Sequence, residues 1–401
     1  EWQHVLQLAQ PDLIWSTDKE CRSIKAWRES KILSGMPSRA INPNSKIQNP
    51  NSKIQNPQGW IMIPTGGSSG HIRFAIHTWE TLAASVVGFQ QYFNVDRIHS
   101  CCALPLYHVS GLMQFMRSFL SGGKLAIVPS HHLSTFIHQI DPTSFFLSLV
   151  PTQLHRLLHQ SELHHPETID QLARFHTILL GGAPAWDELL QTARQQGIRL
   201  APTYGMTETA SQIVTLKPED FLQHQTGCGR VLSHAQIEIR DPKGQPVPMG
   251  EIGTIAIHAD SLALGYYPDR FTSEWFVTDD LGFFDPQGYL HIVGRNSRKI
   301  ITGGENVFPT EVEAAIRSTQ LVKDVYVLGL PDSEWGERVT AVYVPIEADV
   351  PIEALQTALS TRLTKFKQPK TWIALPELPR NAQGKVNDKQ VRQAIVNLKL
   401  Q

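Results

Sequence analysis

The sequence predicts an α/β protein: a large N-terminal domain of mainly parallel sheets with helices and a small β subdomain, followed by a small α+β C-terminal domain. Two observations lead to this prediction. Short apolar runs alternate with helical patterns from residue 60 to about residue 294, as in parallel sheets with crossover helices. The chain of 401 residues also exceeds the roughly 250 to 300 residues at which a single core usually divides. We therefore expect one domain at 1–294 and a second at 298–401.

The first strand is predicted by the apolar run "GWIMIP" at residues 59–64, which precedes a Gly/Ser-rich loop. Before it, the heptapeptide "NSKIQNP" occurs twice, at residues 44–50 and 51–57. This polar repeat is too short for a solenoid unit, and we expect residues 41–59 to be a disordered surface linker. The chain begins at Glu1 without a methionine, partway into a helix and strand pattern, so we expect the natural protein to have earlier residues.

Four further β-like runs follow: "HSCCALPL", "KLAIVP", "SFFLSLVP" and "FHTILLGG", with the helical patterns "TQLHRLLHQ" and "AWDELLQTARQQ". Residues 236–259 instead hold two β runs around a Pro/Gly turn, which predicts the β subdomain. We place the hinge at "GRNSRK" (294–299). Beyond it, a helical pattern, two β runs and a helix that begins after Pro351 predict the C-terminal domain. That last helix would carry an apolar stripe of Ile352, Leu355, Leu359 and Leu363.

Composition excludes several classes of function. A net charge of −1 gives no general attraction to nucleic acid or to anionic membranes, so any anion must be bound locally. The four cysteines and seventeen histidines show no zinc-ligand spacing, and no apolar run reaches the roughly 18 to 20 residues of a membrane span. No signal-peptide pattern is present. We expect a cytoplasmic protein without a nucleic-acid partner or a membrane span, and a homo-oligomer is compatible with the sequence.

The stretch "IPTGGSSGHIRFA" at residues 63–75 is a candidate phosphate-binding loop. Glycines let backbone N–H groups converge on an anion, and hydroxyl groups add donors. The residues that would supply them are Thr65, Gly66, Gly67, Ser68, Ser69 and Gly70. A Walker P-loop is excluded, because no Gly-Lys-Ser/Thr ends the run. The loop alone leaves a flexible surface turn open as the alternative.

Four more stretches follow the loop in order: "LLGGAP" (179–184), "PTYGMTETA" (202–210), the segment 275–313 and "LPRNAQGKV" (378–386). With the loop, they resemble the core motifs of the adenylate-forming superfamily, which includes acyl- and aryl-CoA synthetases. The resemblance covers residues 60–386. It implies an enzyme that uses ATP and Mg²⁺ to convert a carboxylate into an acyl-AMP with loss of pyrophosphate, and then transfers the acyl group to a thiol such as coenzyme A. Cations and donors around the triphosphate suit that chemistry.

The resemblance implies a nucleotide site residue by residue. Arg73 stands where the family's loop has a lysine, so a guanidinium fork would replace an ammonium at the triphosphate. Thr207 is the counterpart of the α-phosphate contact and Glu208 of the Mg²⁺ ligand, and both are candidates for the metal site. Taken alone, Glu208 would be a charge at a helix start. Contacts to adenine and ribose are implied for Gly181, Gly182, Ala183, Pro184, Tyr204, Asp280 and Arg295.

The remaining implied roles fall on the C-terminal part of the chain, and two departures from the family pattern lie before it, at residues 279 and 297. Lys385 resembles the lysine that stabilises the charge formed when the carboxylate attacks the α-phosphate, on a mobile domain that then rotates to admit the thiol. Gly303 and Gly304 would give the thiol arm room. Asp279 replaces a glycine and adds charge near the nucleotide, and Ser297 stands where the family commonly has a hinge Asp or Lys.

The acid pocket is assigned to "LPLYHVSGLMQFMRSFLSGG" (104–123). By the same resemblance, His108 would lie near the reacting carboxylate, and Gly205 is a second candidate substrate contact. For His108, a core histidine is the alternative. Arg117 falls off the apolar stripe of the predicted helix, so a solvated arginine is one interpretation. The stripe would consist of Leu112, Phe115, Met116, Phe119 and Leu120.

A more specific resemblance favours a binding role for Arg117. The sequence "PLYHVSG" with an arginine nine residues after its histidine resembles the o-succinylbenzoate CoA ligases of menaquinone and phylloquinone biosynthesis, in which that arginine helps to hold the substrate. The substrate has two carboxylates. One is activated, and the other must meet a cation, because burying it unpaired would cost several kcal/mol.

We therefore predict a two-step acid:CoA ligase that acts on 2-succinylbenzoate, with ATP, Mg²⁺ and coenzyme A. One alternative is another aryl- or medium-chain acyl-CoA synthetase with Arg117 on its surface. A second is an adenylation enzyme that loads a carrier protein, although the 401 residues contain no carrier domain. A third is a non-catalytic nucleotide-binding relative, against which Glu208, Asp280, Arg295 and Lys385 argue.

Overall fold

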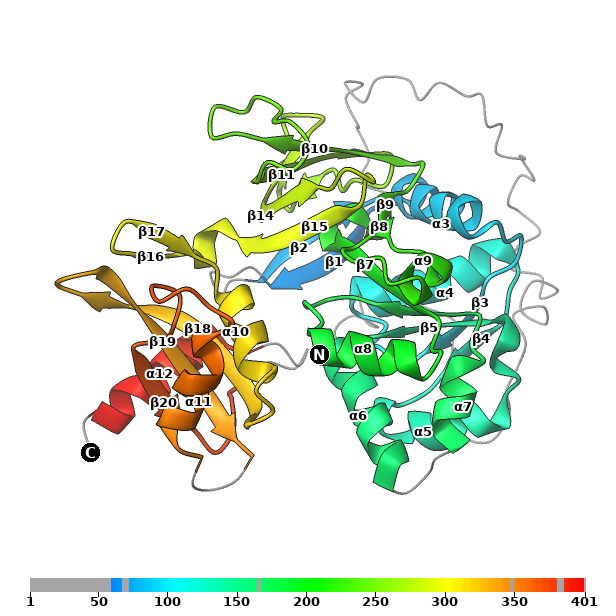
Figure 1. The fold of residues 1–401 in the computed structure, drawn as a ribbon. Helices are drawn as coiled ribbons and strands as arrows, with labels where there is room; N and C mark the ends of the chain where they lie inside the picture. The colour runs from blue at the N-terminus through cyan, green and yellow to red at the C-terminus, as the bar shows by residue number, and fades with distance from the viewer. Residues whose placement is uncertain (1–58, 67–71, 164–166, 347–349, 381–385, 400–401) are drawn as a thin grey trace. The chain divides into compact units, whose positions relative to one another are not determined.

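The computed structural model of the chain is shown in Figure 1. It describes residues 59–66, 72–163, 167–346, 350–380 and 386–399. The expected linker at 41–59 therefore lies outside the described residues except for Gly59, and so do four residues of the Gly/Ser loop, 67–70, and Lys385. No helix in the described ranges is long and apolar enough to cross a membrane.

A seven-stranded sheet forms the centre of the N-terminal part, in the order β4-β3-β5-β6-β7-β8-β9. The first five strands in this order are parallel, and β8 and β9 run antiparallel to their neighbours. The strands are β3 (His99–Cys102), β4 (Leu125–Ile127), β5 (Phe145–Leu149), β6 (Thr177–Leu180), β7 (Leu200–Met206), β8 (Ser211–Thr215) and β9 (Arg230–Val231). The four β-like runs are thus confirmed as β3 to β6, in a mainly parallel sheet.

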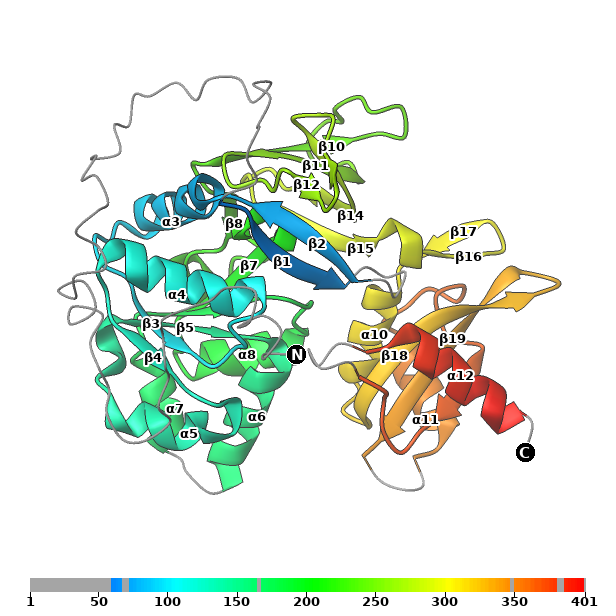
Figure 2. The ribbon, with the colours of Figure 1, turned by 180° about the vertical axis from the view of Figure 1, so that it is seen from behind.

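Helices cover both faces of this sheet (Figures 1 and 2). Leu147 and Leu149 of β5 pack in one core with α6, α7 and α8, whereas Phe146 packs in another with α3 and α4. This alternation along β5 is what a strand buried on both faces requires. The helices are α3 (Trp79–Phe93), α4 (Val109–Ser121), α5 (Leu133–Phe136), α6 (Pro151–Leu163), α7 (Glu167–Ala173), α8 (Asp187–Gln195) and α9 (Pro218–Leu222).

Two smaller antiparallel sheets complete the N-terminal part, with the orders β1-β2-β12-β13 and β10-β11-β14-β15. The Gly/Ser loop connects β1 and β2, so it joins two antiparallel strands. The predicted β subdomain is confirmed, and β14 and β15 enlarge it. The strands are β1 (Ile61–Gly66), β2 (Ile72–His77), β10 (Ala235–Arg240), β11 (Gly253–Ala259), β12 (Gly265–Tyr266), β13 (Asp269–Arg270), β14 (Phe276–Phe284) and β15 (Leu290–Arg295).

From residue 300 onward the chain forms a sheet of its own, in which β16, β17, β18, β19 and β20 pair. The predicted stripe on the helix after Pro351 was partly wrong. Leu355 and Leu359 are buried, but Ile352 is exposed and Leu363 lies beyond the end of the helix. The elements are β16 (Ile300–Thr302), β17 (Glu305–Val307), α10 (Pro309–Arg317), β18 (Val322–Asp332), β19 (Gly336–Pro345), α11 (Ile352–Ser360), β20 (Thr371–Ala374) and α12 (Asp388–Lys399).

Candidate active site

Several candidate residues of the N-terminal part lie where parallel strands of the central sheet end. The segment 181–184 follows β6, Tyr204 lies in β7, Glu208 follows β7, and His108 lies beyond β3 at the N-terminal boundary of α4. In open α/β sheets, ligands bind beyond the carboxyl ends of the strands. The topology therefore brings these residues to the edge of the sheet where a ligand is expected.

The glycines of this edge are required either by close packing or by a left-handed backbone conformation. A Cβ on Gly181 would lie 2.5 Å from Thr203 Oγ1, and Gly182 has a left-handed φ of +81°. A Cβ on Gly205 would lie 2.1 Å from the carbonyl oxygen of Ser211. Glycine at 205 therefore lets β7 and β8 approach at the shift in their register, which is a structural reason that stands beside its predicted substrate contact.

Three residues predicted to surround the adenosine contact one another: pairing of β14 with β15 joins Asp280 and Arg295, and Tyr204 reaches Asp280 from β7. Asp280 lies opposite Arg295, whose Nε donates to Asp280 Oδ1 at 3.2 Å. The Tyr204 hydroxyl donates to Asp280 Oδ2 at 2.8 Å. Burial, followed by the charge of Asp280, raises the pKa of Tyr204 well above its usual value, so the phenol remains a donor. A carboxylate oriented by two donors is suited to accept from ribose hydroxyls.

The two departures from the family pattern contact each other. The Ser297 backbone N–H donates to Asp279 Oδ1 at 3.0 Å, and its hydroxyl donates to Asp279 Oδ2. Both carboxylate oxygens of Asp279 therefore accept hydrogen bonds from the segment that follows β15. Its carboxylate is directed to the serine that stands at the expected hinge.

The turn that holds Thr207 and Glu208 is fixed from two sides. His77, at the end of β2, donates from Nε2 to the Thr207 carbonyl oxygen at 2.8 Å, and the N–H of Ala263 donates to the Glu208 carbonyl oxygen at 2.7 Å. Burial lowers the pKa of His77 to about 4, so this imidazole is neutral and its donor is the N–H of Nε2. The Glu208 carboxylate is almost fully buried and accepts from the Tyr266 hydroxyl at 2.5 Å.

This turn fits a magnesium ion that is bound mainly through phosphate. Within the described part of the chain, no three His, Cys, Asp or Glu residues converge as a metal site. Mg²⁺ is commonly held by one or two carboxylates together with phosphate oxygens and water. Glu208 would supply the carboxylate, and the phosphates of a bound nucleotide would supply the other oxygens.

Arg73 points from β2 toward the same turn. Its partner across the β1–β2 hairpin is Thr65, and its guanidinium lies 3.9 Å from the centre of the Tyr266 ring. The candidate loop cation and the candidate metal ligand Glu208 therefore contact one tyrosine. Gly67, Ser68, Ser69 and Gly70 remain predictions, since they lie outside the described residues, and Thr65 and Gly66 end β1.

The structure overturns the interpretation of Arg117 as a solvated residue. Its side chain is only 2% exposed, on the face of α4 that carries Met113, Gln114 and Ser118. The predicted apolar stripe was partly right: Met116 is buried in the core, and Leu112, Phe115 and Leu120 are partly buried and pack against that core. α4 packs against both α3 and the sheet, so its polar residues are enclosed as well.

Arg117 has neutral partners. Its Nη2 donates to Gln212 Oε1 at 3.0 Å and to Ser211 Oγ at 3.3 Å, and its guanidinium lies 4.4 Å from the centre of the Phe89 ring. Among the described residues, no carboxylate pairs with it, and its Nε lacks a hydrogen-bond acceptor. Burial lowers the pKa of Arg117 to about 9, which still leaves it charged at neutral pH. A buried cation of this kind attracts an anionic group.

Other buried polar atoms near this part of α4 also lack partners within the described residues. They are both ring nitrogens of His234 and Oε1 of Gln114. Burial, with a smaller effect of the Arg117 charge, lowers the pKa of His234 to about 4. Its ring lies against α3, where a Cβ on Gly88 would come within 1.8 Å of Nδ1. The His108 ring contacts the Tyr107 ring in a tilted arrangement, with 4.3 Å between ring centres.

In the C-terminal part, the structure gives Gly303 and Gly304 a role in a turn. Both have left-handed φ values, +58° and +83°, where β16 turns into β17. A Cβ on Gly303 would lie 2.8 Å from the Trp335 ring, whereas nothing lies within 4 Å at Gly304. The space expected for a thiol arm is therefore open at Gly304 and occupied by Trp335 at Gly303.

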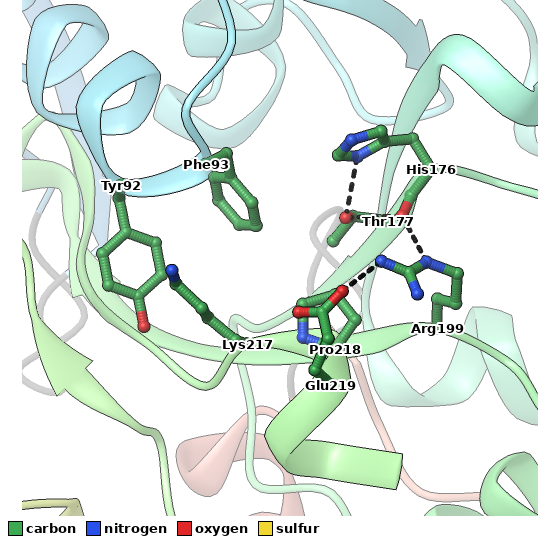
Figure 3. Close-up of a pocket in the computed structure, with 8 residues that line it drawn as sticks. All are labelled: Tyr92, Phe93, His176, Thr177, Arg199, Lys217, Pro218 and Glu219. Carbon is green, nitrogen blue, oxygen red and sulfur yellow. Dashed lines mark hydrogen bonds and ion pairs between the residues drawn. The ribbon is translucent and has the colours of Figure 1, made fainter.

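A separate small cavity of about 130 Å³ contains none of the predicted residues (Figure 3). It lies at the start of β6 and β7, the opposite ends of these strands from Gly181 and Glu208. An Arg199–Glu219 ion pair with an N–O distance of 2.5 Å crosses it. Its lining residues are Tyr92, Phe93, His176, Thr177, Arg199, Lys217, Pro218 and Glu219. The cavity is thus distinct from the candidate active site.

Sequence reasoning missed four residues that the structure places in contact with the candidates: His77, Gln212, Tyr266 and, near Arg117, His234. None lies in a motif with recognised spacing. Tyr266 is 58 positions from Glu208, and only the pairing of β12 with β2 brings it to Arg73. Residue pattern alone carries no signal for such contacts.

Comparison with known proteins agrees with this geometry. Residues 2–267 match the family of AMP-binding enzymes, and residues 311–385 match the AMP-binding enzyme C-terminal domain. The chain is 33% identical to the 2-succinylbenzoate–CoA ligase of Enterococcus faecalis over 80% of its length and 67% of the relative. It is 34% identical to the enzyme of that name from Listeria monocytogenes, over 82% of its length and 68% of the relative.

Solved structures give the same result. The o-succinylbenzoate CoA synthetase (MenE) of Bacillus subtilis, in complex with the acyl-adenylate intermediate OSB-AMP, is 31% identical with a TM-score of 0.74, covering 82% of this chain and 68% of that one. Its complex with ATP and magnesium gives 31% identity and a TM-score of 0.73, over 82% and 69% of the two chains. ATP-bound MatB from Rhodopseudomonas palustris is 27% identical with a TM-score of 0.74, over 84% and 68%. The chain belongs to the family of AMP-binding enzymes.

Proposed function

We propose that the protein is an ATP-dependent acid:CoA ligase that converts 2-succinylbenzoate to 2-succinylbenzoyl-CoA through an acyl-adenylate. The names of its relatives and the MenE complexes with ATP, magnesium and OSB-AMP support this proposal. The reaction has two steps. A carboxylate oxygen attacks the α-phosphorus of ATP and pyrophosphate leaves; the coenzyme A thiolate then attacks the acyl carbon and AMP leaves.

One observation carries the choice of acid: Arg117 is a buried guanidinium whose hydrogen-bond partners in the described structure are neutral. 2-Succinylbenzoate brings two carboxylates. One would react near His108, and the second would meet the guanidinium in a place from which water is largely excluded, where a charge-assisted pair is strong. A monocarboxylic acid would leave Arg117 without an anion.

The residues of the nucleotide side have complementary proposed roles. Asp280, held by Tyr204 and Arg295, would accept from the ribose hydroxyls. Arg73 and the Gly/Ser loop would bind the triphosphate, Thr207 the α-phosphate and Glu208 the magnesium ion. Lys385 would stabilise the charge that develops at the α-phosphate. We further propose domains at 1–294 and 298–401, with the second one mobile, and a cytoplasmic location stays a prediction.

A pyrophosphate-release assay tests the proposal. The full chain would receive ATP, Mg²⁺ and one of five acids: 2-succinylbenzoate, benzoate, 4-coumarate, octanoate or acetate, each with and without coenzyme A. We expect turnover with 2-succinylbenzoate alone, and acyl-CoA product only when coenzyme A is present. Turnover with octanoate or benzoate instead would support the alternative of another acyl-CoA synthetase. Binding of ATP without turnover of any acid would support a non-catalytic relative.

A further inference from the structure

One tyrosine links two candidate groups of the nucleotide side. The Tyr266 hydroxyl donates to Glu208 Oε1 at 2.5 Å, and the face of the same ring lies 3.9 Å from the Arg73 guanidinium carbon. Arg73 belongs to β2, Glu208 to the turn after β7, and Tyr266 to β12. Three segments that are distant in sequence therefore meet at one aromatic side chain.

The strand pairing explains why these side chains meet. β12 pairs with β2 so that Tyr266 lies opposite Ala75, which places Arg73 as its diagonal neighbour on the same face of the sheet. Diagonal neighbours on a sheet are within reach of aromatic and long side chains. Figure 2 shows β12 beside the β1–β2 hairpin. Phe271 packs edge-on against the Tyr266 ring, with 5.4 Å between centres, and so limits its rotation.

The two contacts act on groups of opposite charge. A phenol that donates to a carboxylate forms a short, charge-assisted hydrogen bond that fixes the carboxylate plane. A guanidinium over an aromatic face gains a cation–π attraction and loses rotamer freedom before any ligand arrives. Tyr266 thus pre-orients both the anionic and the cationic group, and neither has to be ordered when the nucleotide binds.

We infer that Tyr266 is a positioning residue for magnesium-bound ATP: its hydroxyl orients Glu208 toward the metal ion, and its ring holds Arg73 beside the triphosphate. This inference rests on the proposed function only in that the chain must bind Mg²⁺-ATP; it is independent of which acid reacts. Outer-shell partners of this type typically change metal affinity by about 10- to 100-fold when they are removed.

The test measures nucleotide binding by the full chain, by isothermal titration, with ATP plus Mg²⁺ and with ATP plus EDTA. Tyr266→Phe removes the hydroxyl and keeps the ring. We expect it to weaken binding of Mg²⁺-ATP about 10-fold and to leave metal-free ATP binding within twofold. Tyr267→Phe is the matched control, because Tyr267 is the next residue in the chain and its side chain is 55% exposed. This control should bind as the parent does.

Two more variants separate the contacts. In a Glu208→Gln background, Tyr266→Phe should cause no further loss, because the carboxylate through which the hydroxyl acts is gone. Tyr266→Leu, which removes the ring as well, should weaken metal-free ATP binding too, since Arg73 then loses its support. A melting temperature within about 2 °C of the parent would show that each variant is folded.

Equal loss with and without Mg²⁺ in Tyr266→Phe would overturn the inference, as would unchanged binding of Mg²⁺-ATP or an additive effect with Glu208→Gln. A parent chain that binds Mg²⁺-ATP but does not turn over 2-succinylbenzoate would contradict the proposed acid and leave the role of Tyr266 standing. Absence of ATP binding in the parent would overturn both.

Discussion

The proposed nucleotide side and the proposed acid side of the site, the latter built around Arg117, differ in how their charges are arranged. On the nucleotide side, Asp280 already accepts from Tyr204 and Arg295, and Glu208 accepts from Tyr266. On the acid side, the Arg117 guanidinium is buried against neutral groups. Asp280 therefore has a cationic partner before the nucleotide arrives, whereas Arg117 lacks an anion among the described residues. We therefore expect affinity for ATP to come from side chains that are already oriented. Selection of the acid would come from the uncompensated charge of Arg117.

The largest expected effect comes from removing that charge. Arg117→Ala should raise KM for 2-succinylbenzoate by about 100-fold or more, because the second carboxylate would be buried without a cation. KM for ATP should change less than twofold. Steady-state pyrophosphate release, with each substrate varied in turn, measures both. An unchanged KM for the acid would remove Arg117 from the acid pocket and end the contrast between the two sides.

A second variant at Arg117 tests how much the buried charge destabilises the unliganded protein. Arg117→Met keeps much of the side-chain volume and removes the buried guanidinium, so it should stabilise the unliganded protein by about 1 kcal/mol or more. Chemical denaturation without ligands measures this. Loss of stability in this variant would indicate that the neutral partners already compensate the charge.

A smaller effect is expected on the nucleotide side. Tyr204→Phe removes one of the two donors to Asp280, and Arg295 remains. KM for ATP should rise about 10-fold, since one hydrogen bond to a charged group contributes roughly 1.5 kcal/mol or more, and KM for 2-succinylbenzoate should not change. If the two KM values rose together, the sides would be coupled rather than separate.

The smallest expected effect on activity concerns the two buried histidines, which act mainly on stability. His77 and His234 have pKa values lowered from 6.5 to about 4, mainly by burial. These histidines take up a proton at a higher pH in the unfolded chain than in the folded one, so protonation favours unfolding. The folded state therefore has its full stability above pH 6.5 and loses stability as the pH falls toward 4. Each can account for up to about 3 kcal/mol of the free energy of unfolding.

Urea titrations at pH 7.5, 5.5 and 4.5 would measure this loss. His234→Leu should flatten the pH dependence and leave the turn at Thr207 intact, whereas His77→Leu should flatten it and also weaken Mg²⁺-ATP binding, since His77 supports Thr207. A pH profile that neither substitution alters would place the acid-sensitive groups elsewhere.

The sequence predicted the fold well where apolar periodicity was strong. The strands β3 to β6 and helices α6 and α8 follow from alternating runs, because each is buried by the same layered sheet. The helix α4 shows the limit of this reasoning. Its apolar residues suggested that Arg117 faces water, but α4 is enclosed on more than one side, and a helical stripe cannot reveal how many neighbours a helix has.

For the site too, local sequence features were predicted and contacts between distant segments were not. Motif residues such as Asp280 and Arg295 could be named in advance, and their pairing across β14 and β15 agrees with a shared role. The supporting residues His77 and Tyr266 could not, because their contacts arise from strand pairing between distant segments. Residues of a motif can thus be recognised from local sequence, whereas residues that position them depend on contacts between distant segments.

The hydrogen bonds between Asp279 and Ser297 have a consequence for how this protein can change over generations. A glycine at 279 would leave Ser297 without its acceptor, and an aspartate at 297 would face a second carboxylate. Either single replacement is therefore expected to lower stability, and the two positions should change together. Descendants of this chain would reach the combination of glycine at 279 and aspartate at 297 only through a less stable intermediate or by changing both residues together.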